Sequence, residues 1–348
     1  LSGRSKQSMI RAIKGTRDIL PPQSSIWNQA EARVRDVFRA YNYAEIRTPI
    51  FEETALFARG VGEETDIVTK EMYTFADRDG TSLTLRPENT ASVIRSYIEH
   101  RMDQQPGLKK LYYIGPMFRR ERPQKGRFRQ FFQIGAEAIG SPSPVVDAEV
   151  IEMVTVLLRA CGLNDFHLVI NSVGDQESRA AFIAKLREEL APVKDQLNED
   201  NRRRAETNPL RVLDSKDPND EEIISKLPSI HDFLNDDCRN HFATVRQLLD
   251  DRAIPYEVRP RLVRGLDYYT HTTFEIVHGS LGAQNSIMGG GRYNGLAESL
   301  GSKVPAPGIG FSIGEDRLMM AVEDAGSIKA DGGVEIFIAT MARCSAGL

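Results

Sequence analysis

Two runs of strand-forming residues, 110–118 and 130–139, flank a loop that is dense in positive charge. Such a pair predicts two antiparallel strands joined by the loop. Further runs of strand-forming residues occur at 72–75, 82–85, 166–173, 256–263, 268–277, 286–288 and 308–313. Because the strands come as hairpins and not as strand–helix alternations, we predict an α+β fold, with an antiparallel sheet flanked by helices.

Helical spacing of apolar residues is clearest near the amino terminus, where Val34, Val37, Phe38 and Tyr41 recur at three- and four-residue intervals. This helix is predicted to begin at Ser24, a good N-cap residue, and to lead into an extended stretch at 45–50. Other helices are predicted at 89–102, 147–160 and 315–324. The charged stretch between 175 and 251 has a mostly helical pattern and interrupts the strand-rich sequence.

Composition excludes several classes of protein. The chain has 348 residues, is 41% hydrophobic and carries a net charge of −4, so RNA contacts must come from local patches. No apolar run approaches the ~20 residues of a membrane helix, and residues 1–7 are too polar for a signal peptide. Three scattered cysteines predict neither disulfides nor zinc, which favours a reducing cytoplasm. The six histidines show no metal-ligand spacing.

The basic loop is the first candidate site. It places six cations in eleven residues: Arg119, Arg120, Arg122, Lys125, Arg127 and Arg129. A solvated hairpin tip is the ordinary interpretation of such a run. Aromatic residues interleave with the charges, however, and strand alternation would put Glu121 on the same face as Arg119. Arginine forks suit phosphate oxygens, so the loop predicts a site for a polyphosphate joined to a base.

The loop and its strands resemble motif 2 of the class II aminoacyl-tRNA synthetases, through 118–121 (Phe-Arg-Arg-Glu) and 127–131 (Arg-Phe-Arg-Gln-Phe). Residues 310–317 resemble motif 3, and 34–49, ending at Pro49, fall where motif 1 is expected. The resemblance implies an ATP site in which Arg119 holds the α-phosphate and Glu121 the adenine side. It further implies that Arg127 reaches the outer phosphates, while the adenine lies between Phe131 and Arg317.

Other segments resemble one branch of that class, the histidyl-tRNA synthetases. They are 264–270 (Arg-Gly-Leu-Asp-Tyr-Tyr-Thr), 289–296 (Gly-Gly-Gly-Arg-Tyr-Asn-Gly-Leu), 14–21 and 85–90. The resemblance runs in unbroken order from Ile10 to Thr340. It implies a histidine–tRNA ligase that uses ATP with Mg²⁺, forms histidyl-adenylate and pyrophosphate, and transfers histidine to tRNA(His). The motif 1 region, with the apolar stripe at 34–41, implies a homodimer.

A histidine pocket needs an acceptor for one ring nitrogen and a donor for the other. Glu137 lies among apolar neighbours in a predicted buried strand, where an unpaired carboxylate would be costly, so it is the candidate acceptor. The resemblance implies a histidine-binding set of Glu88, Asn89, Thr90, Arg119, Gln133, Glu137, Arg264, Tyr268, Tyr269 and Tyr293. Arg264 and Arg119 would be the catalytic cations that clamp the α-phosphate from opposite sides. No dedicated metal-ligand cage is expected, because Mg²⁺ is bound mainly through phosphate and water.

The predicted division of the chain follows from these assignments. Residues 9–174 and 253–328 form the two parts of the catalytic core, and 175–252 form a helical insertion whose run Arg202–Arg204 is either a tRNA contact or a solvated face. We interpret residues 1–8 as a vector-derived remnant ahead of a native start at Met9. Residues 329–348 are predicted to be a linker and the opening strand, 334–340, of a truncated anticodon-binding domain.

Two rival interpretations belong to other functional classes. One is a synthetase-like regulatory subunit of histidine biosynthesis, which senses histidine and does not catalyse. The other is an RNA-sensing module of a larger signalling protein. Both classes tend to lose the ATP-gripping residues, whereas this chain keeps Arg119, Glu121, Arg127, Arg264 and Arg317. Exchange of pyrophosphate into ATP with each amino acid in turn discriminates between an enzyme and either rival.

Overall fold

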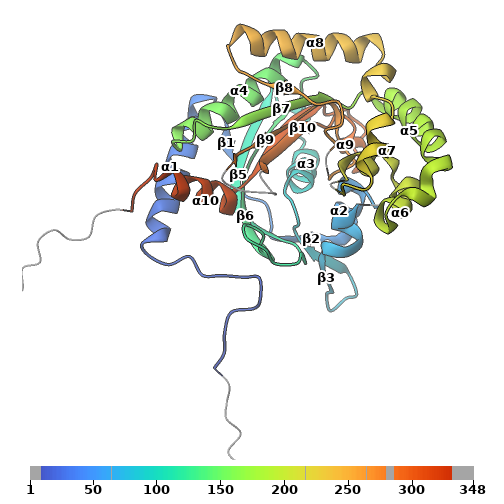
Figure 1. The fold of residues 1–348 in the computed structure, drawn as a ribbon. Coiled ribbons are helices and arrows are strands. Elements are labelled where there is room, and N and C mark those ends of the chain that lie inside the picture. Colours follow the sequence, from blue (N-terminus) through green and yellow to red (C-terminus); the bar gives the residue numbers. More distant parts are fainter. Residues whose placement is uncertain (1–8, 64, 216, 264, 280–285, 331–348) are drawn as a thin grey trace, which may run out of the picture.

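A computed structural model describes residues 9–63, 65–215, 217–263, 265–279 and 286–330. Its centre is an eight-stranded sheet in the order β1-β5-β6-β11-β10-β9-β7-β8 (Figure 1). The strands span Ala44–Glu45 (β1), Lys109–Phe118 (β5), Gln130–Ile139 (β6), Gly308–Gly314 (β11), Ser286–Arg292 (β10), Thr270–Val277 (β9), His167–Ser172 (β7) and Glu257–Val258 (β8). Neighbouring strands from β5 to β7 are antiparallel, as predicted, whereas β1 and β8 join the two edges in parallel.

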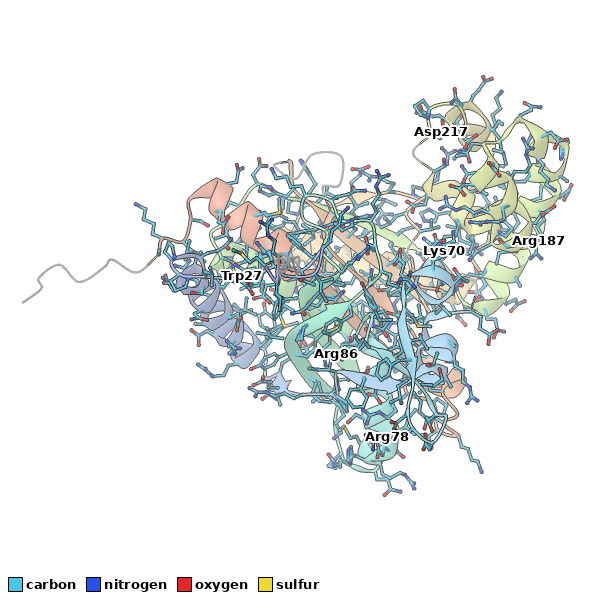
Figure 2. The ribbon with its side chains drawn as sticks, turned by 90° about the horizontal axis from the view of Figure 1, so that it is seen from below. Trp27, Lys70, Arg78, Arg86, Arg187 and Asp217 are labelled. Carbon is cyan, nitrogen blue, oxygen red and sulfur yellow. The ribbon has the colours of Figure 1, made fainter. Side chains whose placement is uncertain are left out.

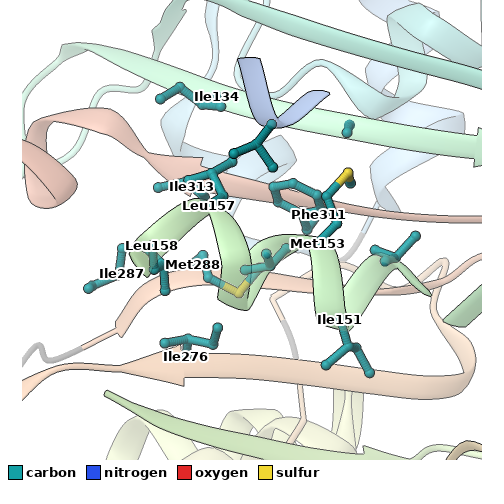
Figure 3. Close-up of a cluster of buried hydrophobic side chains, with 14 of the residues drawn as sticks. Ile134, Ile151, Met153, Leu157, Leu158, Ile276, Ile287, Met288, Phe311 and Ile313 are labelled. Atoms are coloured by element: carbon teal, nitrogen blue, oxygen red, sulfur yellow. The ribbon is translucent and has the colours of Figure 1, made fainter. Parts of the chain in front are cut away.

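One face of the sheet is apolar and carries the main core. Strands β6 and β11 alternate, so that Ile134, Ala136 and Ala138 and their partners Ile309, Phe311 and Ile313 all belong to the same buried cluster. Four helices cover this face: α1 (Gln23–Ala40), α4 (Pro144–Ala160), α8 (Asp236–Asp251) and α10 (Glu315–Ala325). Figure 3 shows Met153 and Leu157 of α4 against this layer of strand side chains.

The opposite face is only partly covered. Helices α3 (Thr90–Glu99) and α9 (Leu296–Ser299) pack over one end of it and share a second apolar cluster with Tyr113, Met117 and Ile139. Beside them lies a three-stranded sheet, in the order β2-β4-β3, built from Phe51–Glu53 (β2), Ser82–Leu85 (β4) and Tyr73–Ala76 (β3). Helix α2 (Thr54–Val61) joins β2 to the rest of this layer. The remainder of the face is open.

The chain between β7 and α8 is helical, as its sequence predicts. It contains α5 (Gln176–Leu190), α6 (Glu199–Thr207) and α7 (Glu221–Lys226), joined by short 3-10 turns. Its apolar side chains, among them Phe182, Leu186 and Val212, form a cluster separate from the main core. Figure 2 shows this helical segment as a lobe at the upper right, which bears the labelled Arg187 and Asp217.

Several local predictions differ from the structure. Helix α1 begins at Gln23 with Pro22 as N-cap, so Ser24 lies inside the first turn and does not cap the helix. Strand β10 does not end at Met288: it continues through three glycines because β9 and β11 pair with it on both sides. Of the predicted strand 256–263 only β8 forms. Residues 1–8 and the predicted strand 334–340 lie outside the described residues.

The apolar stripe of α1 has a different role from the one expected. Val34 and Phe38 have no exposed surface and Val37 has 8%, because all three pack into the main core of their own chain. The Phe38 ring stacks on Tyr112 of β5 with centroids 4.4 Å apart. We predicted a homodimer partly from this stripe, but its buried side chains cannot form an interface with a second subunit.

A buried ion pair joins strand β10 to helix α4. Arg292, at the end of β10, and Asp147, in α4, are both fully buried. Arg292 Nε lies 3.1 Å from Asp147 Oδ2, and its other nitrogens donate to Ser141 O and Ser143 O. Burial alone would raise the pKa of Asp147, but the hydrogen bond from His241 and the charge of Arg292 outweigh it and lower that pKa.

Asp147→Asn should therefore destabilise the protein far more than an exposed substitution. Removing one partner leaves an uncompensated buried charge, which costs roughly 3–5 kcal/mol. Urea unfolding measures the change, with Asp165→Asn as the exposed control, expected within about 0.5 kcal/mol of the parent. Equal stabilities for the two variants would contradict the role given to the pair.

Candidate active site

The open face of the sheet forms one wall of a large cleft. Its empty volume is about 1890 Å³, part of which is continuous with solvent. The described residues that line it come from three regions: the basic hairpin, the strands β9–β11 with α10, and the helical segment. Seven of the predicted site residues are among them: Arg119, Glu121, Arg127, Phe131, Gln133, Tyr269 and Arg317.

Two of the six cations of the basic hairpin, Arg119 and Arg127, line the cleft. Arg119 Nη1 lies 3.7 Å from Glu121 Oε1, and Arg127 Nη1 lies 3.3 Å from Glu121 Oε2. Arg119 and Glu121 are thus close together, as predicted. The reason given for this, strand alternation, was wrong, because β5 ends at Phe118 and neither residue is in a strand. The Arg119 guanidinium also lies 5.3 Å from the centroid of the Phe131 ring, a cation–π distance.

Arg317 reaches the same space from the first turn of α10. Its Nη1 donates to Ser286 O at 2.7 Å and its Nε to Gly126 O at 3.3 Å. Gly126 is at the tip of the basic loop with φ +72°, a backbone conformation that favours glycine. Burial, with repulsion from Arg127, lowers the pKa of Arg317. The loop tip and the motif 3 helix are therefore joined across the cleft.

An amino-terminal segment also holds the hairpin, which the sequence did not predict. Arg17 Nη2 lies 2.7 Å from Asp316 Oδ1, and its guanidinium lies 4.6 Å from the Phe128 ring centroid. The second oxygen of Asp316 accepts the Phe132 backbone N–H at 2.9 Å. Residue Gly15 accepts the Arg129 N–H at 2.7 Å. The segment thus fixes the position of the hairpin relative to α10.

Beyond the floor of the cleft lies a buried carboxyl group, Glu137 of β6. Thr90 Oγ1 donates to Glu137 Oε1 at 2.8 Å, and Tyr293 Oη donates to Oε2 at 2.6 Å. Glu137 has no exposed surface. Burial raises its pKa to about 8, and the nearby Glu88 adds to the effect, while the hydrogen bonds from Tyr293 and Thr90 oppose it. An imidazole N–H has a suitable acceptor here.

Room for Glu137 comes from a glycine on the neighbouring strand. Gly310 of β11 is directly opposite Glu137 in the register. A Cβ atom at Gly310 would lie 1.7 Å from Glu137 Oε2, so no other residue fits without displacing the carboxyl group. Gly291 of β10 plays the same part for the Tyr269 ring, which a Cβ there would approach to 2.7 Å.

Two predicted histidine ligands are occupied by contacts within the chain. Glu88 accepts the backbone N–H groups of Thr90 and Ala91 at 2.7 and 3.0 Å, so its carboxyl group caps the start of α3. Asn89 Oδ1 accepts from Thr48 Oγ1 at 2.6 Å. Gln133, by contrast, has its Oε1 without a hydrogen-bond partner in the part of the chain described. Gln133 also lines the cleft, whereas Glu88 and Asn89 do not.

The aromatic wall next to Glu137 is formed by the two predicted signature segments. The Tyr268 ring meets Tyr269 and Tyr293 edge to face, with centroids 4.8 and 5.9 Å apart. Tyr269 lines the cleft, whereas Tyr268 and Tyr293 are not among its lining residues. Arg264, the predicted catalytic cation, lies outside the described residues, although Gly265, next to it, lines the cleft.

Two further cations line the cleft, and only one of them was named from the sequence. Arg204 of α6 and Arg211, in the turn after it, line the cleft from the helical segment. Arg204 belongs to the basic run that was left open between a contact and a solvated face, but Arg211 is isolated in sequence and gave no signal. The described residues contain no group of three or more His, Cys, Asp or Glu placed to hold a metal ion.

Comparison with known proteins gives this geometry a family. The sequence model described as histidyl-tRNA synthetase matches residues 15–318. The chain belongs to the histidyl-tRNA synthetase family. Two curated relatives named histidine–tRNA ligase are similar: that of Solibacter usitatus is 70% identical, over 90% of this chain and 76% of its own length. That of Koribacter versatilis is 62% identical, over 91% of this chain and 74% of its own length.

Solved structures of the same family agree with the fold. The apo histidyl-tRNA synthetase of Staphylococcus aureus superposes with a TM-score of 0.75 at 44% sequence identity. The match covers 93% of this chain and 76% of that structure. The class II synthetase fold expected from the sequence is thereby confirmed, with its antiparallel sheet, flanking helices and helical segment between β7 and β8.

Glu137→Gln should remove a pH-dependent part of the stability. The neutral carboxyl group is favoured in the folded protein, so its contribution is complete below pH ~4.5 and is lost as the pH rises through about 8. Between these pH values the free energy of unfolding of the parent should fall, relative to that of the variant, by at most roughly 1.4 kcal/mol per pH unit. Urea unfolding from pH 4.5 to 9 measures the difference, with Glu99→Gln as the exposed control. Parallel curves for parent and Glu137→Gln would disprove the shifted pKa.

Proposed function

We propose that this chain activates L-histidine with ATP, forming histidyl-adenylate and pyrophosphate, and then transfers histidine to the 3′ end of tRNA(His). The observation that carries the proposal is the arrangement of groups on the open face of the sheet. Arginines suited to a polyphosphate line the cleft there. Glu137 alternates on β6 to the same face as Gln133, which lines the cleft. The names of the curated relatives support the same activity.

The first step is attack by the histidine carboxylate on the α-phosphorus of ATP, which expels pyrophosphate. Both reactants are anionic, so the site must neutralise charge as it grows on the phosphorus oxygens. No protein nucleophile is needed, and catalysis consists of positioning and electrostatic stabilisation. We assign this to Arg119 and Arg264. The ATP is held by Glu121, Arg127, Phe131 and Arg317.

The imidazole ring is recognised from the sheet. Glu137 Oε1 and Oε2 each accept one hydrogen bond, and an oxygen that does not carry the carboxyl proton keeps a lone pair for a ring N–H. We propose that Tyr269 faces the ring and that Gln133 Oε1 accepts from the α-amino group. The remaining predicted residues do not touch histidine in this proposal. They hold α3 and Glu137 in place, and they are Glu88, Asn89, Tyr268 and Tyr293.

Mg²⁺ is expected to arrive with ATP. It prefers oxygen ligands and keeps several waters and phosphates in its shell. The carboxylates that line the cleft, Glu121, Asp214, Glu275 and Asp316, could offer such an ion oxygen ligands. When bound, the ion would neutralise charge on the departing pyrophosphate.

The second step requires the acceptor end of tRNA to reach the adenylate. The terminal adenosine hydroxyl attacks the activated carboxyl carbon and AMP leaves. We propose that 175–252 is an inserted domain between two parts of the catalytic core, 9–174 and 253–328. Its separate apolar cluster supports this division, and Arg204 and Arg211 offer cations beside the cleft for the RNA backbone.

Such an enzyme works where translation takes place, so we place it in the cytoplasm. Cys161 and Cys238, both buried, are free thiols, which fits a reducing compartment. In the described part of the chain, no helix combines the length and apolarity needed to cross a bilayer.

Pyrophosphate exchange with each common amino acid tests the proposed function. We expect exchange with histidine alone and a loss on the order of 100-fold or more in Arg264→Ala, because one transition-state donor typically accounts for that much. Glu137→Ala should instead weaken histidine binding about tenfold or more and leave ATP binding unchanged. The exposed Arg78→Ala serves as the control. Histidine binding without any exchange would favour the regulatory, histidine-sensing class.

We further propose that the chain is a homodimer, with an interface different from the α1 stripe. Ile50, Phe51 and Phe75 follow Pro49 in or beside the small sheet and are 44, 52 and 45% exposed. The rings of Phe51 and Phe75 lie 6.5 Å apart, so they form one apolar patch. Such patches mark interaction sites, and two-fold pairing is the commonest use.

Light scattering at micromolar concentration tests the interface. The parent should have the mass of two chains, and Phe51→Glu with Phe75→Glu should shift the mass toward one chain, since a like-charged patch opposes itself across a two-fold axis. Val145→Glu, at another exposed apolar residue, is the control. A monomeric parent would refute the dimer, whereas an unchanged dimer in the double variant would refute only this interface.

A further inference from the structure

Arg179 of α5 lies beneath the loop that carries Gly265, Tyr268 and Tyr269. Its Nη1 donates to Asp267 O at 2.9 Å and to Tyr269 O at 2.8 Å. These two carbonyl groups flank Tyr268 on either side. A single side chain from the helical segment therefore fixes the backbone of the loop at both ends of its aromatic pair.

The environment of Arg179 is unusual for a structural arginine. Arg179 is half-buried, and among the described residues its guanidinium group forms no ion pair with a carboxylate. Partial burial lowers its pKa, and only the charge of Asp267 opposes this. Both of its hydrogen bonds go to the loop backbone, so its effect must be sought in what it positions.

Other contacts tie the same loop to elements on both sides. Asn208, which follows α6, donates to Asp267 Oδ1 at 3.4 Å, and the Asp267 N–H bonds Val61 O of α2 at 3.2 Å. Gly62 has φ +107°, and a Cβ there would come within 2.8 Å of Asp267 Oδ2. The loop is thus held between α2 and the helical segment at Asp267.

Space remains on the Arg179 side of the loop. A cavity with an empty volume of about 510 Å³, part of which is continuous with solvent, is lined by Arg179, Asn208, Arg211, Asp267 and Tyr269, among others. Arg179 and Tyr269 therefore border the same space.

We propose that Arg179 is a positioning residue for histidine recognition: it holds the loop 265–269 so that Tyr269 closes the amino-acid end of the cleft. The inference rests on the proposed function, since it assigns histidine to that end. Arg179 touches no substrate. It acts through the backbone of the loop, and it makes the helical segment a determinant of amino-acid affinity.

The test compares Arg179→Met, which removes the donors, with Arg179→Lys, which keeps the charge but not the fork. Arg187→Ala is the matched control, because Arg187 lies on the same helix and is exposed. Pyrophosphate exchange gives KM for histidine and for ATP separately, calorimetry gives histidine affinity, and thermal unfolding reports the fold.

Arg179→Met should raise the histidine KM about tenfold or more, because two hydrogen bonds from a charged donor are lost. The ATP KM should stay within about twofold, and Arg179→Lys should be intermediate. Arg187→Ala should match the parent. In Arg179→Ala, millimolar guanidinium ion should lower the raised histidine KM, because it can occupy the vacated space beside the cavity.

Each outcome discriminates. Equal increases in both KM values would mean a general structural role and would overturn the inference. An unchanged histidine KM in Arg179→Met, with the parent active, would overturn the inference alone. A parent that neither binds histidine nor exchanges pyrophosphate would refute the proposed function, and the inference with it. If Arg179→Met unfolds, Arg179→Lys and the guanidinium rescue decide the question on folded protein.

Discussion

The alternation of side chains along β6 and β11 is the constraint on which the rest of the structure depends. On one face Ile134, Ala136 and Ala138 meet their partners on β11 and hold four helices against the sheet. The residues between them point the other way, and they are small or polar, with Gly310 opposite Glu137. A shift of register by one residue would exchange the core with the cleft.

Arginine serves two purposes in this fold, and position decides which. Arg119, Arg127 and Arg317 line the open cleft. Arg292, which is buried, and Arg179, which is half-buried, donate to the chain itself: Arg292 holds β10 to α4, and Arg179 holds a loop to α5. Arg292 stands inside a family signature, so membership of a motif does not by itself imply contact with a substrate.

The sequence predicted what local pattern controls. The hairpin of β5 and β6, the helical segment and the burial of Glu137 all follow from periodicity, charge density and neighbouring residues. The family resemblance predicted that five residues lie together, and all of them line the cleft: Arg119, Glu121, Arg127, Phe131 and Arg317. Local sequence pattern does not predict which distant residue a long side chain contacts. Arg17 reaches Asp316 across 299 positions, and Arg211 reaches the cleft only because a turn aims it there. The α1 stripe likewise needed a partner, and sequence alone could not say that this partner was the chain's own core.

The order of the strands has a consequence for how the chain emerges during synthesis. β6 is made early and pairs at once with β5, but its other neighbour, β11, begins only at Gly308. Until then β6 presents an unpaired edge, and the wall behind Glu137 has no Gly310. Exposed edges invite pairing with other chains. Between the two events the helical segment is synthesised, and it has an apolar cluster of its own to bury. In the nascent chain, therefore, β5 and β6 wait for β11 while the helical segment can already bury its own apolar cluster. The site cannot exist before the last strand arrives.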